Sequence, residues 1–374
     1  MKRIKKMILG SLMGCAMMVA ATGIAFADDS INLTDMADTI ESEDFRQVLL
    51  TYLSDEEVHS CTEQDLKAAY INSPFQIANM DVNGQISYSN KIWYAPVTKD
   101  DEIISIITFV GDGKVACTIS EGYVDVLNRL LNESSDDAVK LFAFSGQIYG
   151  ATEDRVYNMN TGELEEIVCP DITEIYISGN RAERQVNNED ILHYSINSLL
   201  SGRTVESIAS GKQLKNYPTF SQGSQPLCWA GTIASMVKYE FPSQYSSITI
   251  NDVCKAVNYY QGASWDKIKA AMNYYFKSPY IPTYIESPLS RDQVKVVIGN
   301  DDPGLMSSLN PTKTSAHITA LIGYKDTPSG MSVKIMNPGT GKLEWGYYST
   351  SAFSYAYNNE VYKWDKTIRL LYQA

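Results

Sequence analysis

The chain has 374 residues, of which 44 are acidic and 31 basic, and its formal net charge at pH 7 is −13. This acidic balance, with no basic patch along the sequence, argues against a nucleic-acid-binding protein. The sequence also contains no phosphate-binding glycine loop and no set of residues at metal-ligand spacing, so no cofactor is expected. The 6 cysteines stand singly, without a CxxC pair, which argues against a dense disulfide framework.

The first segment has the pattern of a secretory signal. Four basic residues lie among the first six, residues 7–24 form an apolar run, and Ala25-Phe26-Ala27 precedes Asp28. We therefore expect residues 1–27 to be cleaved, which leaves a secreted, extracellular protein without a stable association with the membrane. The alternatives are an uncleaved membrane anchor, because the run approaches spanning length, and a lipoprotein modified at Cys15.

The remaining chain divides by charge into two halves. Residues 28–212 carry 33 acidic and 12 basic side chains, whereas residues 213–374 carry 11 acidic and 15 basic ones. Opposite net charges favour mutual attraction, so we expect the first half to be an acidic propeptide that inhibits the second. The alternative is that it is merely soluble. Residues 201–216, which contain scattered glycines and serines, are the expected linker and the place for a maturation cut.

The acidic half is expected to be a mostly antiparallel β domain with one helix. Its first part, residues 28–57, is polar and is expected to be disordered or helical. A turn at residues 111–113 predicts a hairpin, and the lone His59 and His193 lack metal-spaced partners. The predicted strands are 85–96, 103–110, 115–119, 139–144, 148–151, 156–159 and 164–168, and the predicted helix is 123–131.

The second half contains the segment with the most chemical information. Gln222-Gly223-Ser224-Gln225-Pro226-Leu227-Cys228 is followed by Trp229-Ala230 and by apolar residues at helical spacing, which predicts a helix over residues 228–239. Cys228 therefore lies at a helix N-terminus, where unpaired N–H groups and the helix dipole favour a nucleophilic thiolate.

One histidine follows Cys228 in the sequence. His317 opens an apolar run that predicts a strand over residues 317–324, and Asn337-Pro338 ends the next predicted strand. With the Gln-to-Cys spacing, this order resembles that of papain-like cysteine peptidases, and most closely their secreted bacterial branch, the staphopain-like enzymes, and the bacteriocin-leader peptidases. The resemblance covers about residues 220–374. Because this chain is predicted to be exported, we do not expect the double-glycine leader specificity of transport-coupled relatives.

The remaining elements of the second half fit the α+β fold that the resemblance implies, in which helices pack on an antiparallel sheet. The predicted helices are 251–260, 265–276 with Ser264 as its cap, and 291–298 with a capping box from Ser290 to Gln293. The predicted strands are 304–309, 317–324, 332–336, 343–347 and 362–371.

The resemblance assigns a role to each matching residue. Cys228 is the nucleophile, His317 the general base and acid, and Asn337 the residue that orients the imidazole. Gln222 donates its side-chain N–H to the oxyanion, beside the backbone N–H of Cys228.

Four further residues have expected roles that remain less specific. Asp326 is the fallback for Asn337, because some relatives use an aspartate to orient the imidazole. Trp229 is expected to pack behind the helix, and Trp345 either to shield Asn337 or to lie in the core. Cys254 is expected to be a buried structural thiol, although a disulfide with Cys228 would also be possible.

The sequence thus predicts a secreted, monomeric cysteine endopeptidase that is made as a zymogen and acts on proteins or peptides. Two alternatives stay open. The same residues could transfer an acyl group to an amine, as in transglutaminase-type enzymes, or the chain could be a non-catalytic surface or binding module with a peptidase-like fold.

Overall fold

The computed structural model describes residues 30–111, 115–135, 138–176, 192–201, 210–348 and 353–372. Three predicted segments lie wholly or mostly outside this part of the chain. They are the signal, residues 112–113 of the turn predicted over 111–113, and residues 202–209 of the linker. The described residues form a mixed α+β protein with large antiparallel sheets and nine helices. Within them, no helix combines the length and the apolar character that crossing a membrane requires.

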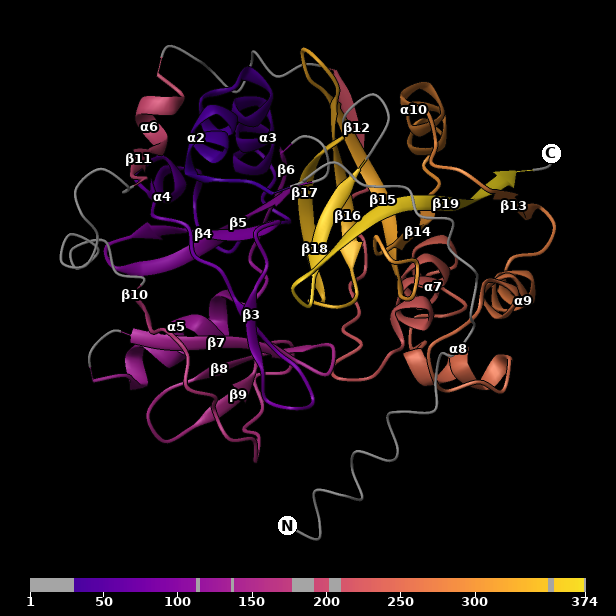
Figure 1. Cartoon of the computed structure of the whole chain (residues 1–374). Coiled ribbons are helices and arrows are strands. Elements are labelled where there is room, and N and C mark those ends of the chain that lie inside the picture. Colours follow the sequence, from indigo (N-terminus) through magenta and orange to yellow (C-terminus); the bar gives the residue numbers. More distant parts are fainter. Residues whose placement is uncertain are drawn as a thin grey trace, which may run out of the picture.

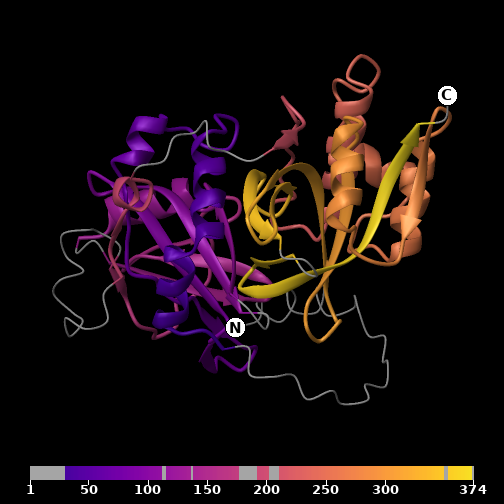
Figure 2. The same cartoon turned by 90° about the horizontal axis from the view of Figure 1, so that it is seen from above.

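The two halves of the chain lie side by side, as Figures 1 and 2 show from perpendicular directions. In the N-terminal half the helices are α2 (Leu33–Glu41), α3 (Glu43–Leu53), α4 (Glu63–Lys67), α5 (Val124–Glu133) and α6 (Ile196–Leu199). Its strands are β1 (Tyr70–Ile71), β2 (Ala78–Met80), β3 (Ile86–Tyr88), β4 (Ile92–Lys99), β5 (Glu102–Gly111), β6 (Val115–Ser120), β7 (Ala138–Phe144), β8 (Gln147–Ala151), β9 (Val156–Asn158), β10 (Ile175–Tyr176) and β11 (Tyr194–Ser195).

Most predicted strands of this half are confirmed, but the predicted strand 85–96 forms two strands in different sheets, β3 and β4, and the described residues form five helices rather than one. The described part of the segment predicted as disordered or helical forms α2 and α3, which Ser42 separates by capping α3 through the backbone N–H of Phe45. The strand predicted over residues 164–168, all of which are described, is wrong. Leu164 makes only an isolated bridge, and Val168 is 87% exposed, because no other strand provides a continuous partner.

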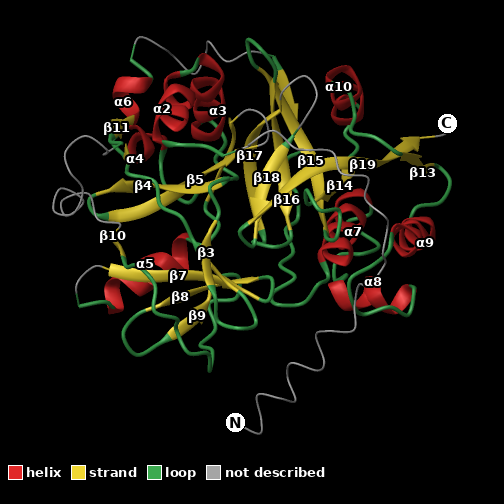
Figure 3. Cartoon of the chain, in the orientation of Figure 1, coloured by secondary structure: helices red, strands yellow, loops and turns green. Residues whose placement is uncertain are grey.

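In the C-terminal half the helices are α7 (Cys228–Glu240), α8 (Ile250–Ala256), α9 (Trp265–Tyr275) and α10 (Arg291–Gly299). Its strands are β12 (Gly211–Gln213), β13 (Tyr280–Ile285), β14 (Gly304–Leu309), β15 (Ala316–Asp326), β16 (Met331–Asn337), β17 (Lys342–Tyr348), β18 (Ser354–Tyr357) and β19 (Glu360–Tyr372). Figure 3 shows how the helices and the sheet are arranged.

The sequence predicted the helices of this half well and missed three strands, β12, β13 and β18. The capping box of α10 is confirmed, since Ser290 accepts from the backbone of Gln293, whose side chain accepts from the backbone of Ser290. Ser264 precedes α9, but its side chain makes no capping hydrogen bond. Helix α8 ends at Ala256 rather than at residue 260, and β12 contains the predicted boundary between residues 212 and 213.

Both faces of the C-terminal sheet are covered. Adjacent side chains of a strand point to opposite faces, and on β14 Leu305 clusters with α7, α8 and α9, whereas Met306 clusters with α10 and α3. Helix α3 belongs to the N-terminal half, so that half provides part of the cover.

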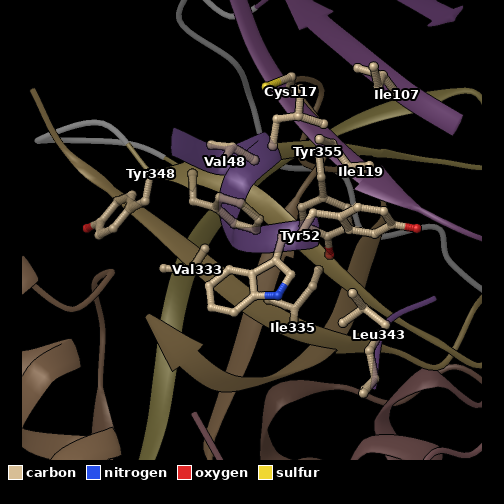
Figure 4. Packing of buried hydrophobic residues seen from close by; sticks show 14 of the residues in the cluster. Val48, Tyr52, Ile107, Cys117, Ile119, Val333, Ile335, Leu343, Tyr348 and Tyr355 are labelled. Atoms are coloured by element: carbon tan, nitrogen blue, oxygen red, sulfur yellow. The ribbon is translucent and has the colours of Figure 1, made fainter. Parts of the chain in front are cut away.

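One sheet and one core run through both halves. Strand β17 pairs with β6 in antiparallel register, with Trp345 opposite Ile119 and Gly346 opposite Thr118, which joins the strands of both halves into a 13-stranded sheet. Figure 4 shows that Val48 and Tyr52 of α3 pack with Val333 and Ile335 of β16 in one hydrophobic cluster. The acidic half is therefore not merely attached by a linker but shares its core with the other half.

Candidate active site

Cys228 is the first residue of α7, and the start of this helix lies against the strand that carries His317. The hydroxyl of Thr232, one turn along the helix, donates to the carbonyl of Ile318 at 3.0 Å in a buried position. The backbone N–H groups of Ile318 and Trp229 face the Cys228 sulfur. The thiol therefore lies next to the residue that directly follows His317.

His317 and Asn337 come together from neighbouring antiparallel strands, β15 and β16. The imidazole Nε2 lies 2.8 Å from Oδ1 of Asn337, and both residues are 1% exposed. The backbone N–H of Gly339 donates to the same Oδ1 at 2.9 Å. An amide oxygen held in this way accepts a hydrogen bond from Nε2–H, which leaves the other ring nitrogen free for chemistry.

The backbone of Gln222 is hydrogen-bonded to the turn that follows Asn337. Its N–H donates to the carbonyl of Pro338 at 2.8 Å, directly after Asn337. The side-chain Nε2 donates to the carbonyl of Gln225 at 2.8 Å and to the Tyr357 hydroxyl at 3.0 Å, whereas Oε1 is buried without a partner.

Helix α7 and the Asn337 turn approach closely at a glycine. A Cβ at Gly231 would lie 3.1 Å from Cβ of Pro338, so a larger residue would push the helix away from the turn. The four predicted residues thus converge on one corner of the sheet, although no hydrogen bond joins the Cys228 sulfur to the imidazole within the described residues.

Tyr357, which sequence reasoning missed, covers this corner. Its ring stacks on the His317 imidazole with centroids 3.9 Å apart and an interplanar angle of 16°, while its hydroxyl accepts from Gln222. A Cβ at Gly339 would overlap the Tyr357 ring, so glycine is required there for the ring to fit. Tyr357 is only 7% exposed. Its hydroxyl accepts the hydrogen bond of the Gln222 side-chain N–H, the donor that the sequence assigns to the oxyanion.

Loss of solvation acts against the charged forms of both Cys228 and His317, although Cys228 is half-buried rather than enclosed. Burial raises the pKa of the Cys228 thiol to about 11, although the backbone N–H groups facing the sulfur act in the other direction. Burial also lowers the pKa of His317 to about 4, against the opposing effect of its hydrogen bond to Asn337. Desolvation therefore opposes the thiolate that the helix N-terminus is expected to favour.

Glu344 is a second residue that sequence reasoning missed. Its carboxylate is 4% exposed and accepts from Nδ2 of Asn337 at 2.9 Å and from the Thr340 hydroxyl at 3.1 Å. Burial raises the pKa of Glu344 to about 7, while the two hydrogen bonds act to lower it. A glutamate in the middle of a strand has no sequence signal that distinguishes it from an ordinary exposed position.

The fallback and shielding residues lie elsewhere. Asp326 is at the opposite end of β15 from His317 and forms an ion pair with Lys295 at 2.7 Å, so it does not orient the imidazole. The Trp345 indole points into the shared core and donates to Asp55 at 2.8 Å. Its role is therefore in the core, one of the two possibilities expected for it.

The remaining cysteine and tryptophan predictions agree with the structure. Cys254 is fully buried, and it and Cys228 are both free thiols, so no disulfide joins them. Trp229 is fully buried behind the helix start and donates to the carbonyl of Gln261 at 3.0 Å. Among the described residues, no group of histidine, cysteine, aspartate and glutamate side chains has the arrangement of a metal site.

Comparison with known proteins identifies no family for this chain. No protein-family model matches the chain, and no curated protein matches it.

Proposed function

We propose that this chain is a papain-like cysteine endopeptidase, secreted as a zymogen, that hydrolyses peptide bonds in proteins or peptides. The observation that carries the proposal is the 2.8 Å hydrogen bond between His317 and Asn337, next to a helix that begins at Cys228. A buried imidazole oriented by an amide beside a cysteine thiol is the arrangement that nucleophilic catalysis by cysteine needs.

The roles follow from these positions. Cys228 Sγ attacks the scissile carbonyl, and His317 first takes the thiol proton and then donates it to the leaving amine. Asn337 stabilises the imidazolium by accepting from Nε2. The side-chain N–H of Gln222 and the backbone N–H of Cys228 stabilise the oxyanion, and loss of one such donor costs about 10²–10³ in rate.

The closed site supports the zymogen part of the proposal. Tyr357 ends β18 and is followed by the two-residue turn Asn358–Asn359, in which both residues have positive φ. The N-terminal half holds this turn. Asn359 donates to the carbonyl of Ile77 at 2.9 Å and to the side chain of Asn79 at 2.9 Å.

Further contacts hold the turn from the same side. Tyr94 donates to Asn359 at 3.3 Å, and Asn160 donates to Asn358 at 3.1 Å. The acidic half therefore inhibits by fixing the turn that places Tyr357 over His317. Movement of this turn would expose the pair to solvent and return the pKa values of Cys228 and His317 toward their usual range.

The test is cleavage of a peptide library under reducing conditions, by the full chain and by the turn variant Asn359→Ala. Peptide release that requires Cys228 and survives Cys254→Ala supports the proposal. Thiol-directed alkylation should also reach Cys228 at least about ten times faster than Cys254. Absence of Cys228-dependent cleavage from both proteins would overturn the proposal, and product that forms only with an added amine would assign an acyl transferase instead.

A further inference from the structure

The hydrogen bond between His317 and Asn337 depends on which way the Asn337 amide faces. Oδ1 accepts from His317 Nε2, and it also accepts from the backbone N–H of Gly339 at 2.9 Å. The opposite orientation would place the Nδ2 donors against the imidazole and against this N–H. Orientation of the amide therefore decides whether it can stabilise an imidazolium.

Glu344 provides the contact that distinguishes the two ends of the amide. An ionised carboxylate only accepts hydrogen bonds, so it requires Nδ2 of Asn337 on its side, at the observed 2.9 Å. The Thr340 hydroxyl donates to the same Oε1 at 3.1 Å and fixes the carboxylate in turn. The result is a chain of hydrogen bonds from Glu344 through Asn337 to His317.

The surroundings make this carboxylate unusual. It borders a cavity of about 20 Å³ whose other walls include Tyr94, Ser120 and Tyr123 of the N-terminal half. A carboxylate this deeply buried opposes folding unless its hydrogen bonds compensate, and an apolar residue would fill the site at lower cost. A glutamate at position 344 is thus better explained by its effect on Asn337 than by a contribution to the stability of the fold.

We propose that Glu344 is a positioning residue that holds the Asn337 amide with Oδ1 toward His317 and so stabilises the imidazolium formed during catalysis. This inference rests on the proposed peptidase function. Glu344 does not touch the substrate or the reacting sulfur; it acts through Asn337.

Few other groups near Glu344 change charge in the pH range of interest. Tyr94 and Tyr123 face it from the N-terminal half and Tyr355 from β18, and burial holds the pKa of each of these hydroxyls well above 10. Lys342, the nearest cation on the same strand, is directed to Glu121 and Asp125 at 3.8 and 3.7 Å. Glu344, His317 and the Cys228 thiol itself are therefore the groups whose ionisation a pH profile of this corner reports.

The experiment uses the full chain with Asn359→Ala, in which the site is expected to be open, and compares it with the same chain carrying Glu344→Ala, Glu344→Gln or the control Glu121→Gln. Glu121 is also a buried glutamate, 9% exposed, but it accepts from Ser60 rather than from Asn337. The readouts are kcat and KM for a cleaved peptide, and the rate of Cys228 alkylation between pH 5 and 9, with melting temperature as the measure of folding.

Glu344→Ala should lower kcat by roughly 10–100-fold with little change in KM, because the oriented amide is lost. Glu344→Gln keeps an acceptor without a charge. It should retain activity within about threefold near pH 8 and lose the acidic limb near pH 7 that is expected with Glu344 in place. Glu121→Gln should leave both the kinetics and the profile unchanged, even if it melts at a lower temperature.

The outcomes separate this inference from the function on which it rests. An Asn359→Ala chain that shows no Cys228-dependent cleavage and alkylates Cys228 no faster than Cys254 overturns both. An active Asn359→Ala chain with folded Glu344 variants of equal kcat and unchanged pH profile overturns the positioning role alone.

Discussion

Lys334 and Asp55, one from each half of the chain, form a buried ion pair in which Nζ lies 2.7 Å from Oδ2. Their side chains are 0% and 2% exposed. Glu57 adds a second carboxylate 3.0 Å from the same Nζ. Because Lys334 is on β16, three residues before Asn337, this pair anchors the acidic half directly to the strand that carries a candidate catalytic residue.

Lys334→Met should destabilise the whole chain. Burial acts to raise the pKa of Asp55, but the Lys334 ammonium and further hydrogen bonds hold it below its usual value. Without the cation, a buried carboxylate is left uncompensated, which costs about 3–5 kcal/mol of unfolding free energy. Urea unfolding at pH 7 measures this loss. Adding Asp55→Asn to Lys334→Met should recover part of it, and a loss below about 1 kcal/mol for the single variant would contradict the structure.

The two halves should remain associated after the connection between them is cut. Opposite net charges alone would predict separation at high salt, but the interface contains a shared apolar core, in which Val48 and Tyr52 pack with Val333 and Ile335. A protease site introduced within residues 202–209 allows the cut to be made. Both fragments should elute together from a sizing column in 1 M sodium chloride, whereas separate elution would show that charge attraction dominates.

Asn359→Ala should open the site. It removes the donor to Ile77 and Asn79 that holds the turn beside Tyr357, so the stacked ring should leave His317 for part of the time. We expect alkylation of Cys228 to become about tenfold faster, since each tenfold corresponds to about 1.4 kcal/mol and the three hydrogen bonds of the Asn359 side chain are lost. Asn300→Ala, at an exposed helix end, is the control. Equal rates in the two variants would exclude the turn as the element that closes the site.

Glu344→Gln should stabilise the chain in a pH-dependent manner. The pKa of Glu344 is about 7 in the fold and 4.5 in an unfolded chain. Between these values the folded state binds more protons, so its stability falls as pH rises from 4.5 to 7, and the full penalty applies above pH 7. The variant lacks this penalty, and its unfolding free energy should exceed that of the wild type by up to about 3 kcal/mol at pH 8.

The difference in unfolding free energy between the wild type and Glu344→Gln also separates the effect of Glu344 ionisation from that of His317 ionisation. The lowered pKa of His317 means that the unfolded state binds more protons between about pH 4 and 6.5, so its contribution favours stability at higher pH. Because His317 is present in both proteins, its effect cancels in the difference. Denaturant unfolding at pH 4 and pH 8 is the measurement, and a difference independent of pH would show that Glu344 ionises normally.

Sequence periodicity was sufficient to place Cys228, His317 and Asn337 on their elements. Each lies at the start or end of a strongly apolar helix or strand, where the local pattern is clear. Tyr357 could not be found in this way. Its strand has four residues, and its position over His317 depends on the space at Gly339 and on contacts far away in sequence.

The protonation states of Cys228 and His317 could not be predicted from the sequence either. A helix N-terminus does favour a thiolate, but the pKa of Cys228 is decided by how much solvent the surrounding residues exclude, which depends on the tertiary structure. The pairing of β6 with β17 is another long-range feature, because neither strand carries a pattern that specifies its partner. The sequence therefore suggested two halves joined by a linker, while in the structure a 13-stranded sheet crosses both halves.

The pairing of β6 with β17 has a consequence for any attempt to isolate the C-terminal half. Without the acidic half, β17 would become an edge strand whose backbone N–H and C=O groups and Trp345 indole face solvent. Such an edge is a template for pairing with another copy. We expect the isolated segment to self-associate or precipitate. The N-terminal half would then be needed to keep the C-terminal half soluble, because β6 covers the edge of β17.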